Sequence, residues 1–348
     1  MDLIFFLILF ALLTIPHEFG HFIFAKVFGV RVYEYAVGFG PKILEIKGRE
    51  TKFVLRLIPI GGFVKMAGVD DINIPEVESV PEDRKFYKKA PWQRFLILFA
   101  GSFMNFIFAI ILFMAIFLIG IPQPIPVVDK VLENKPASVS GILPGDRILY
   151  IDGKKIEDIS DAVKLITGSI KSPGEKREIE IKVERDGKIV NIKVVPEWSE
   201  ERKGGIIGIV FKTVPKRYSL PTAVKNGFLM FINALILIFY VFKALFNGVQ
   251  GVSIAGPIGI AKMTGEVASM GLIYYLNFLG VLSVQLGVFN LLPIPALDGG
   301  RILFVIIEKI RGKPIETKKE EMVHWIGLLI LLFLMIIVTF FDILNLRK

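Results

Sequence analysis

Two histidines and a glutamate near the N-terminus have the spacing of a metal-binding motif. The segment Thr14–His21 reads TIPHEFGH, so His17, Glu18 and His21 fit the pattern HExxH. On a helix, residues four apart share one face, so both imidazoles could bind one zinc ion, with Glu18 beside it to act on a bound water. The motif lies in an apolar stretch, where unpartnered ionisable groups are costly. The pattern indicates a zinc hydrolase site within a membrane; the alternative is a hydrogen-bonded pair of core histidines.

A catalytic zinc usually takes three protein ligands, so the motif needs a third residue from elsewhere in the chain. The sequence has no Cys and only three His, which leaves as candidates His324, Glu308, Asp342 and Asp298. Asp298 is favoured because it follows an apolar block at the expected membrane depth of the motif, where a cation would offset the cost of its charge. His324 is predicted to be an interfacial residue instead.

The composition is that of an integral membrane protein. The chain has 348 residues, 53% of them hydrophobic, and a mean hydropathy of +0.60. Four blocks, at about 3–28, 95–119, 273–296 and 323–343, are long and apolar enough to span a bilayer. A fifth block at about 228–246 carries a polar face of Asn226, Asn233 and Tyr240, so we interpret it as interfacial or packed against the bundle.

The positive charge orients these spans and does not indicate nucleic-acid binding. The formal net charge is +9, and the basic residues cluster beside the apolar blocks. The connectors 30–93 and 301–322 are rich in Lys and Arg and are therefore predicted to be cytoplasmic. An even number of crossings must separate them, which places the N-terminus and the segment between the second and third spans outside the cytoplasm.

Two segments outside the spans have recognisable local structure. Lys42–Ile46 and Lys52–Ile58 flank a Lys-Gly-Arg-Glu turn and predict a β-hairpin whose apolar face lies on the membrane or folds back on the protein. Val69–Pro91 is predicted to be a loop. Residues 127–213 have soluble composition, and the run Ala137–Asp146 followed by Ile151–Gly153 resembles a PDZ domain of the bacterial type. Such domains bind peptides by strand addition, although a spacer that binds nothing would fit the composition too.

Further segments carry a resemblance that covers nearly the whole chain. They are His17–His21, Gly38–Pro41, Pro59–Val64, Gly101–Phe106 and Asn290–Gly300. With these segments, the chain resembles the site-2 protease family of intramembrane zinc metalloproteases (M50B-like), in particular its bacterial RseP branch with one PDZ domain. The resemblance implies the following roles: zinc ligands His17, His21 and Asp298, general base Glu18, and substrate-positioning residues Asn105 and Asn290. It also implies that the hairpin is a membrane-associated segment that offers an edge strand to an unwound substrate.

The predicted fold is an α-helical integral membrane protein with about four transmembrane helices, a cytoplasmic-side membrane-associated β-hairpin and an inserted extracytoplasmic α/β PDZ-like domain. The predicted segments are transmembrane helix 1 with the motif (1–29), the cytoplasmic connector with the hairpin (30–93), transmembrane helix 2 (94–120), the PDZ-like domain (127–213), an amphipathic or interfacial region (219–271), transmembrane helix 3 (272–300), a cytoplasmic loop (301–322) and transmembrane helix 4 (323–344). Pro293 and Pro295 are expected to break the third of these helices.

The predicted function is hydrolysis, with Zn²⁺ as cofactor, of peptide bonds in or near transmembrane segments. By the resemblance, substrates are single-pass membrane proteins such as anti-sigma factors or signal-peptide remnants, cut near the cytoplasmic side of a prokaryotic plasma (inner) membrane. The main alternative, a membrane-anchored PDZ scaffold with a structural metal, would need a fourth protein ligand. A metal transporter would show internal repeats or a path of intramembrane acidic and His residues. The sequence shows no such ligand, repeat or path.

Overall fold

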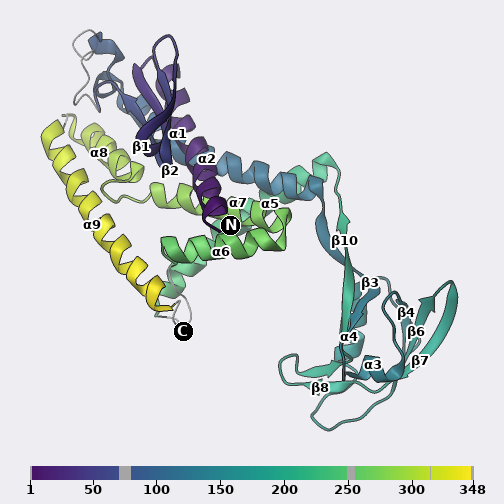
Figure 1. Ribbon diagram of the computed structural model, residues 1–348. Helices are drawn as coiled ribbons and strands as arrows, with labels where there is room; N and C mark the ends of the chain where they lie inside the picture. Colours follow the sequence, from purple (N-terminus) through teal and green to yellow (C-terminus); the bar gives the residue numbers. More distant parts are fainter. Residues whose placement is uncertain (1, 70–79, 249–254, 314, 346–348) are drawn as a thin grey trace. The chain divides into compact units, whose positions relative to one another are not determined.

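Two units make up the chain in this computed structural model, which describes residues 2–69, 80–248, 255–313 and 315–345 (Figure 1). The membrane unit contains Met1–Leu118 and Ser219–Lys348, and the inserted unit contains Ile119–Tyr218. The predicted PDZ-like segment lies entirely within the inserted unit. The helices of the membrane unit are α1 (Asp2–Val27), α2 (Pro91–Ile119), α5 (Leu220–Phe246), α6 (Pro257–Met270), α7 (Leu272–Asn290), α8 (Asp298–Arg311) and α9 (Thr317–Asn345).

Five helices in the described part of the chain are long and apolar enough to cross a membrane, one more than the sequence predicted. The additional helix is α5, whose apolar stretch is Leu220–Ala244. Its polar residues lie on one face, but a second, apolar face including Ala223, Phe231 and Ala234 is buried. That face packs on the bundle, where Phe231 contacts Phe106 of α2. These contacts agree with the second of the two alternatives for this segment, a helix packed against the bundle.

The third predicted span ends earlier than expected, and the predicted loop after it is largely helical. α7 ends at Asn290, and turns containing Pro293 and Pro295 separate it from α8. The break at the prolines is therefore confirmed. The loop prediction for 301–322 was wrong for most of its length, because α8 continues to Arg311 with Ile302 and Val305 buried on one face, and α9 begins at Thr317, before the predicted start of the last helix at 323. A three-residue spacing of buried apolar side chains is what a surface helix requires.

The hairpin is longer than predicted and folds back on itself. β1 (Val32–Lys47) pairs antiparallel with β2 (Lys52–Met66), and Lys47 lies opposite Lys52. Tyr35 lies opposite both Phe53 and Val64, so the first half of β1 has neighbours from β2 on two sides. The hairpin exposes a set of large apolar side chains, namely Phe39, Ile43, Leu44, Ile46, Leu57 and Ile58. An apolar patch of this kind on a membrane protein suits contact with lipid or an apolar substrate.

The base of the hairpin is part of the core that supports α1. Val32 and Val64 are buried in one cluster with Ala25 of α1 and Ile97 of α2. Burial of each such aliphatic side chain contributes about 1.5–3 kcal/mol. Between the hairpin and α2, the predicted loop from Val69 contains the short 3₁₀ helices η2 (Glu82–Arg84) and η3 (Phe86–Lys88). Residues 70–79 of that prediction lie outside the described residues.

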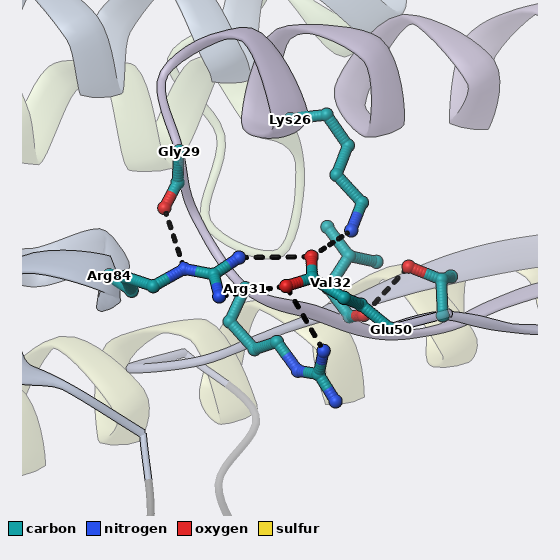
Figure 2. Close-up of polar contacts among 7 residues, drawn as sticks. Lys26, Gly29, Arg31, Val32, Glu50 and Arg84 are labelled. Atoms are coloured by element: carbon teal, nitrogen blue, oxygen red, sulfur yellow. Dashed lines mark hydrogen bonds and ion pairs between the residues drawn. The ribbon is translucent and has the colours of Figure 1, made fainter. Parts of the chain in front are cut away.

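Glu50 ties the hairpin turn to the end of α1 (Figure 2). Its carboxylate accepts two hydrogen bonds from Arg84, at 2.8 and 3.0 Å, and one from Lys26 of α1 at 3.0 Å. Arg31 lies 3.6 Å away. The hydrogen bonds from Arg84 and Lys26 lower the pKa of Glu50 to about 2, so the carboxylate stays ionised at neutral pH. The hairpin is thus fixed at its turn beside the helix that carries the motif.

The inserted unit is a small α/β fold. Its main sheet has the order β10-β3-β4-β6-β7, with β5 paired to β4, and β8 pairs with β9 separately. The elements are β3 (Ile121–Val131), α3 (Pro136–Ser140), β4 (Arg147–Ile151), β5 (Lys154–Lys155), α4 (Ile159–Thr167), β6 (Ile179–Arg185), β7 (Lys188–Val194), β8 (Glu197–Ser199), β9 (Gly204–Ile206) and β10 (Ile209–Lys216). Alternating residues of the strands, such as Ile179, Ile181 and Val183, form its core.

Candidate metal centre

α1 buries both histidines of the motif on one face. His17 and His21 are less than a tenth exposed, and their rings lie edge to face with centroids 4.8 Å apart. The two Nε2 atoms are 3.2 Å apart. Pro16 precedes this turn within the helix, where a proline removes one backbone hydrogen bond. The helical spacing therefore brings two ligand atoms to one point, as the sequence predicted.

Two glycines allow α2 to lie directly against these histidines. A Cβ on Gly20 of α1 would lie 2.2 Å from the carbonyl oxygen of Ala100, and one on Gly101 would lie 2.3 Å from Nε2 of His21. Real Cβ atoms do not approach other atoms this closely, so neither position accepts a side chain without a shift of its surroundings. In the sequence, Gly101 belongs only to a segment that carries the family resemblance. Its packing role has no signal in the sequence alone.

Asp298 supplies a third ligand atom from the first residue of α8. Its Oδ2 lies 3.2 Å from Nε2 of His17 and 3.2 Å from Nε2 of His21. With the 3.2 Å between the two nitrogens, the three atoms form a nearly equilateral triangle. These residues come from opposite ends of the chain and form the one cluster of potential metal ligands found among the described residues.

This triangle has the dimensions of a zinc site. In a tetrahedral complex with bonds of about 2.0–2.1 Å, neighbouring ligand atoms are about 3.3 Å apart. Nδ1 of His21 is 2.8 Å from the carbonyl oxygen of Ile97, to which it donates its proton, so Nε2 presents a lone pair. A lone pair directed at a buried carboxylate oxygen is repulsive unless a proton or a metal ion lies between them. The three residues therefore fit a divalent metal with one position left for water.

Asn105 of α2 lies behind His17 and is fully buried. Its side-chain amide is 3.4 Å from Nδ1 of His17, and its Oδ1 has no hydrogen-bond partner among the described residues. The two ends of an amide have nearly the same shape, so rotation by 180° exchanges oxygen and nitrogen without other changes. The oxygen of the rotated amide accepts a hydrogen bond from Nδ1–H, which leaves Nε2 of His17 available to a metal. The predicted place of Asn105 in substrate positioning stays a prediction.

Glu18 lies between the histidines and the hairpin. It is partly buried, and a Cβ added to Gly62 of β2 would lie 3.0 Å from its Cγ. Tyr35 of β1 donates a hydrogen bond to the carbonyl oxygen of Ile15 at 3.1 Å. Burial, with the negative charge of Glu18, raises the pKa of Tyr35 to about 12, so its hydroxyl remains a neutral donor. The hairpin therefore lies directly beside the predicted general base.

The other candidates for a third ligand have different partners. Glu308 accepts a hydrogen bond at 2.8 Å from the buried Arg94 of α2, which holds α8 against α2. Asp342 accepts hydrogen bonds from the backbone of Gly256 and Gly259, at 3.1 and 2.8 Å, and so caps α6. His324 is not among the residues of the metal-ligand cluster. The described residues provide no fourth ligand of the kind that a closed structural zinc site needs.

Asn290 is the last residue of α7 and is partly buried. It begins the turns that lead to Asp298, so it lies close in sequence to a candidate ligand. The structure gives no contact that assigns its role, and its predicted place in substrate binding stays a prediction.

Comparison with known proteins gives a consistent result along the chain. The model of peptidase family M50 matches residues 5–334. A relative from Clostridium perfringens is 39% identical and aligns over 99% of this chain and 98% of its own. Regulator of sigma-W protease RasP from Bacillus subtilis is 33% identical over 97% of both chains. Zinc metalloprotease RasP from Geobacillus kaustophilus is 31% identical over 98% of this chain and 97% of its own.

One solved structure matches only part of the chain. The PDZ domain of the SdrC-like protein from Listeria innocua is 26% identical over 26% of this chain and 93% of its own, with a TM-score of 0.21. So low a score carries no structural argument. The PDZ-like interpretation of the inserted unit therefore stays a prediction.

Proposed function

The chain belongs to peptidase family M50, and we propose that His17, His21 and Asp298 hold the catalytic zinc of this intramembrane metalloprotease. The protein is a zinc metalloendopeptidase of the membrane that acts in regulated intramembrane proteolysis. The observation that carries the assignment of the ligands is the triangle of 3.2 Å distances among their three ligand atoms. The scaffold alternative is set aside, since the family is one of peptidases.

Glu18 is the general base in this proposal. Zinc bound to the three ligands would supply Lewis acidity and lower the pKa of a water to about 7. Glu18 follows His17 directly on α1, so its carboxylate can reach the open side of the ligand triangle. It accepts the proton of the attacking water and returns that proton to the nitrogen of the leaving amine. The surrounding apolar side chains limit access of other water to the reacting peptide bond.

The hairpin is proposed to hold the substrate in extended form. A transmembrane helix hides its carbonyl groups in internal hydrogen bonds, so it must unwind before a peptide bond can be cut. The part of β2 around Gly62 packs against Glu18, and a substrate strand added there would present its backbone to the base. The exposed apolar residues of the hairpin, such as Ile43 and Leu57, suit an apolar substrate or the membrane surface. Asn290, at the end of α7, is a second proposed contact for the substrate backbone.

The inserted unit is proposed to be a PDZ-like domain on the outer side of the membrane. It contains a cavity of about 160 Å³ lined by residues of α4, of β9 and of the start of β10, among them Ile166, Gly205 and Ile209. In the sheet, β10 pairs with β3 at one end of the strand order, so its other side is the place for an added strand. This arrangement supports a peptide groove between α4 and β10.

The proposed substrates are single-pass membrane proteins, such as anti-sigma factors or signal-peptide remnants. This class is supported by the peptidase family and by the name of one relative, regulator of sigma-W protease RasP. The basic connectors 30–93 and 301–322 are proposed to face the cytoplasm of a bacterium, with the metal centre near that side. This requires an even number of crossings between them, so α5 is proposed to pack against the bundle without crossing the membrane. The lipid bilayer is the other partner, and nothing in the site suits nucleic acid.

Removal of the metal tests the proposed function. We expect the purified protein, reconstituted with a tagged single-pass substrate, to cleave it, to lose cleavage on treatment with a zinc chelator, and to regain it when zinc is added back. The reason is that the two imidazoles and one carboxylate cannot activate a water without the cation. Cleavage that persists at full rate after zinc has been removed, as measured by metal analysis, would contradict the proposal.

Asn105 is proposed to fix the tautomer of His17. We expect Asn105→Leu, which has similar volume but no acceptor, to weaken zinc binding about 10–100-fold, as is usual for loss of a residue that orients a metal ligand. Asn105→Asp keeps an acceptor at the same place and should bind zinc within about 3-fold of the wild type. Competition with a chromophoric chelator measures both affinities. Equal affinity in wild type and Asn105→Leu would show that His17 does not depend on this amide.

A further inference from the structure

The third histidine of the chain lies against the segment that leads to Asp298. The turn segment, residues 291–297, connects α7 to α8, and His324 stands in the N-terminal part of α9. The backbone N–H of Ala296 donates a hydrogen bond to Nδ1 of His324 at 2.8 Å. The side chain of His324 is 12% exposed. The prediction of an interfacial residue did not include this hydrogen bond to the turn segment.

Ala296 needs such a partner because its backbone is strained. Its φ is +77°, in the left-handed region that residues with a Cβ avoid. Pro293 and Pro295 have no N–H, so neither can donate a backbone hydrogen bond to hold this segment. A strained residue persists only where its surroundings hold it in place. The hydrogen bond to His324 provides that restraint from a different helix.

The ring of His324 is itself held in one orientation. It lies against Phe304 of α8, with ring centroids 5.5 Å apart, and its Nε2 lies 4.0 Å from a carboxylate oxygen of Glu320. Because Nδ1 accepts the hydrogen bond from the N–H of Ala296, the neutral ring carries its own proton on Nε2. One turn further along α9, a Cβ on Gly327 would lie 2.5 Å from Cβ of Pro295. α9 thus contacts the turn segment at two successive positions.

The turn segment is packed tightly against the start of α8. A Cβ on Gly299 would lie 2.2 Å from the carbonyl oxygen of Leu292, and one on Gly300 would lie 2.4 Å from that of Ile294. A change of backbone angles at Ala296, two residues before Asp298, would be transmitted to the carboxylate. That carboxylate must lie 3.2 Å from two imidazole nitrogens, and metal sites tolerate displacements of only a few tenths of an ångström.

We propose that His324 is a positioning residue of the metal centre. Its Nδ1 accepts a hydrogen bond from the N–H of Ala296 and so holds the turn segment in the conformation that places Asp298 beside His17 and His21. The inference rests on the proposed zinc site and adds a residue that touches neither the metal nor the substrate. All three histidines of the chain then serve one centre, two as ligands and one through the backbone that carries the third ligand.

Substitutions that differ in the position of the acceptor test this role. In His324→Asn, the side-chain oxygen takes the place of Nδ1, so the hydrogen bond is kept and zinc affinity should stay within about 3-fold of the wild type. His324→Gln moves the amide to the place of Nε2, and His324→Leu removes the acceptor. Both should weaken zinc binding about 10–100-fold. Full-length protein in detergent, titrated with zinc against a chromophoric chelator, gives the affinities, and cobalt substitution reports the ligand geometry by its visible spectrum.

Two controls separate this inference from others. Met322→Leu, at an exposed position of the same helix, should leave zinc affinity unchanged. Asp298→Asn is measured in parallel: if the wild type binds zinc no more tightly than this variant, the proposed ligand set fails, whatever the result at His324. If the wild type binds zinc more tightly than Asp298→Asn does, but His324→Gln and His324→Leu bind zinc as tightly as the wild type, the positioning role is wrong. Equal losses in His324→Asn and His324→Gln would also overturn it, because the acceptor at Nδ1 would then not matter.

Discussion

Glu18→Gln lowers the rate of cleavage roughly 10²–10⁴-fold, the usual contribution of a general acid–base residue, while the zinc content stays at that of the wild type. Glutamine has nearly the same shape but cannot take a proton from water. Glu18 contributes none of the three atoms of the ligand triangle, so metal binding should survive the substitution. The measurement is kcat/KM for a tagged single-pass substrate in reconstituted vesicles, with zinc determined on the same sample.

Glu266→Gln is the matched control, because Glu266 is exposed on α6 and has no part in the proposed chemistry. It should cleave at the wild-type rate. If Glu18→Gln cleaves as fast as this control, another group accepts the proton and the assignment of the base is wrong. If it loses both zinc and activity, Glu18 supports the metal site rather than the chemistry, which also contradicts the prediction.

The metal-ligand cluster is the part of the site for which the sequence carried most information. Residue type and helical spacing sufficed to place His17 and His21 on one face, because a helix has a fixed repeat. Asp298 needed a further physical argument, the cost of an isolated carboxylate beside an apolar block. The structure brings its oxygen to both imidazoles, while the roles of ligand, base and substrate contact remain predictions for experiment.

The start of α8 and the position of α9 could not be predicted. Two consecutive glycines, Gly299 and Gly300, favour a loop by composition, yet they begin a helix because only residues without a Cβ fit against the carbonyl groups of the turn segment. The contact of His324 depends on where α9 lies, and no local pattern specifies a contact between helices that are separated by a loop. The same limit applies to Gly101. This position of α2 must be glycine because a side chain there would collide with the imidazoles of α1.

Asp298→Asn should lower zinc affinity by more than the roughly 10–100-fold expected for loss of a supporting residue, because it removes the only anionic ligand of the proposed set. Asparagine keeps the shape and one oxygen, so packing at the start of α8 is little changed. A neutral amide oxygen is a weaker zinc ligand than a carboxylate, and two imidazoles alone leave the tetrahedral site half filled. The measurement is zinc bound per chain after dialysis against a competing chelator, expected at about one in the wild type and well below it in the variant.

The same substitution at Asp342 separates the ligand from a structural carboxylate. Asp342 caps α6 through the backbone of Gly256 and Gly259, and asparagine also caps helices well. Asp342→Asn should therefore keep full zinc content and cleavage. Should Asp298→Asn retain one zinc per chain and full activity, the third ligand would have to come from another residue. In that event the triangle of 3.2 Å distances would reflect the packing of a carboxylate against two histidines and not a metal site.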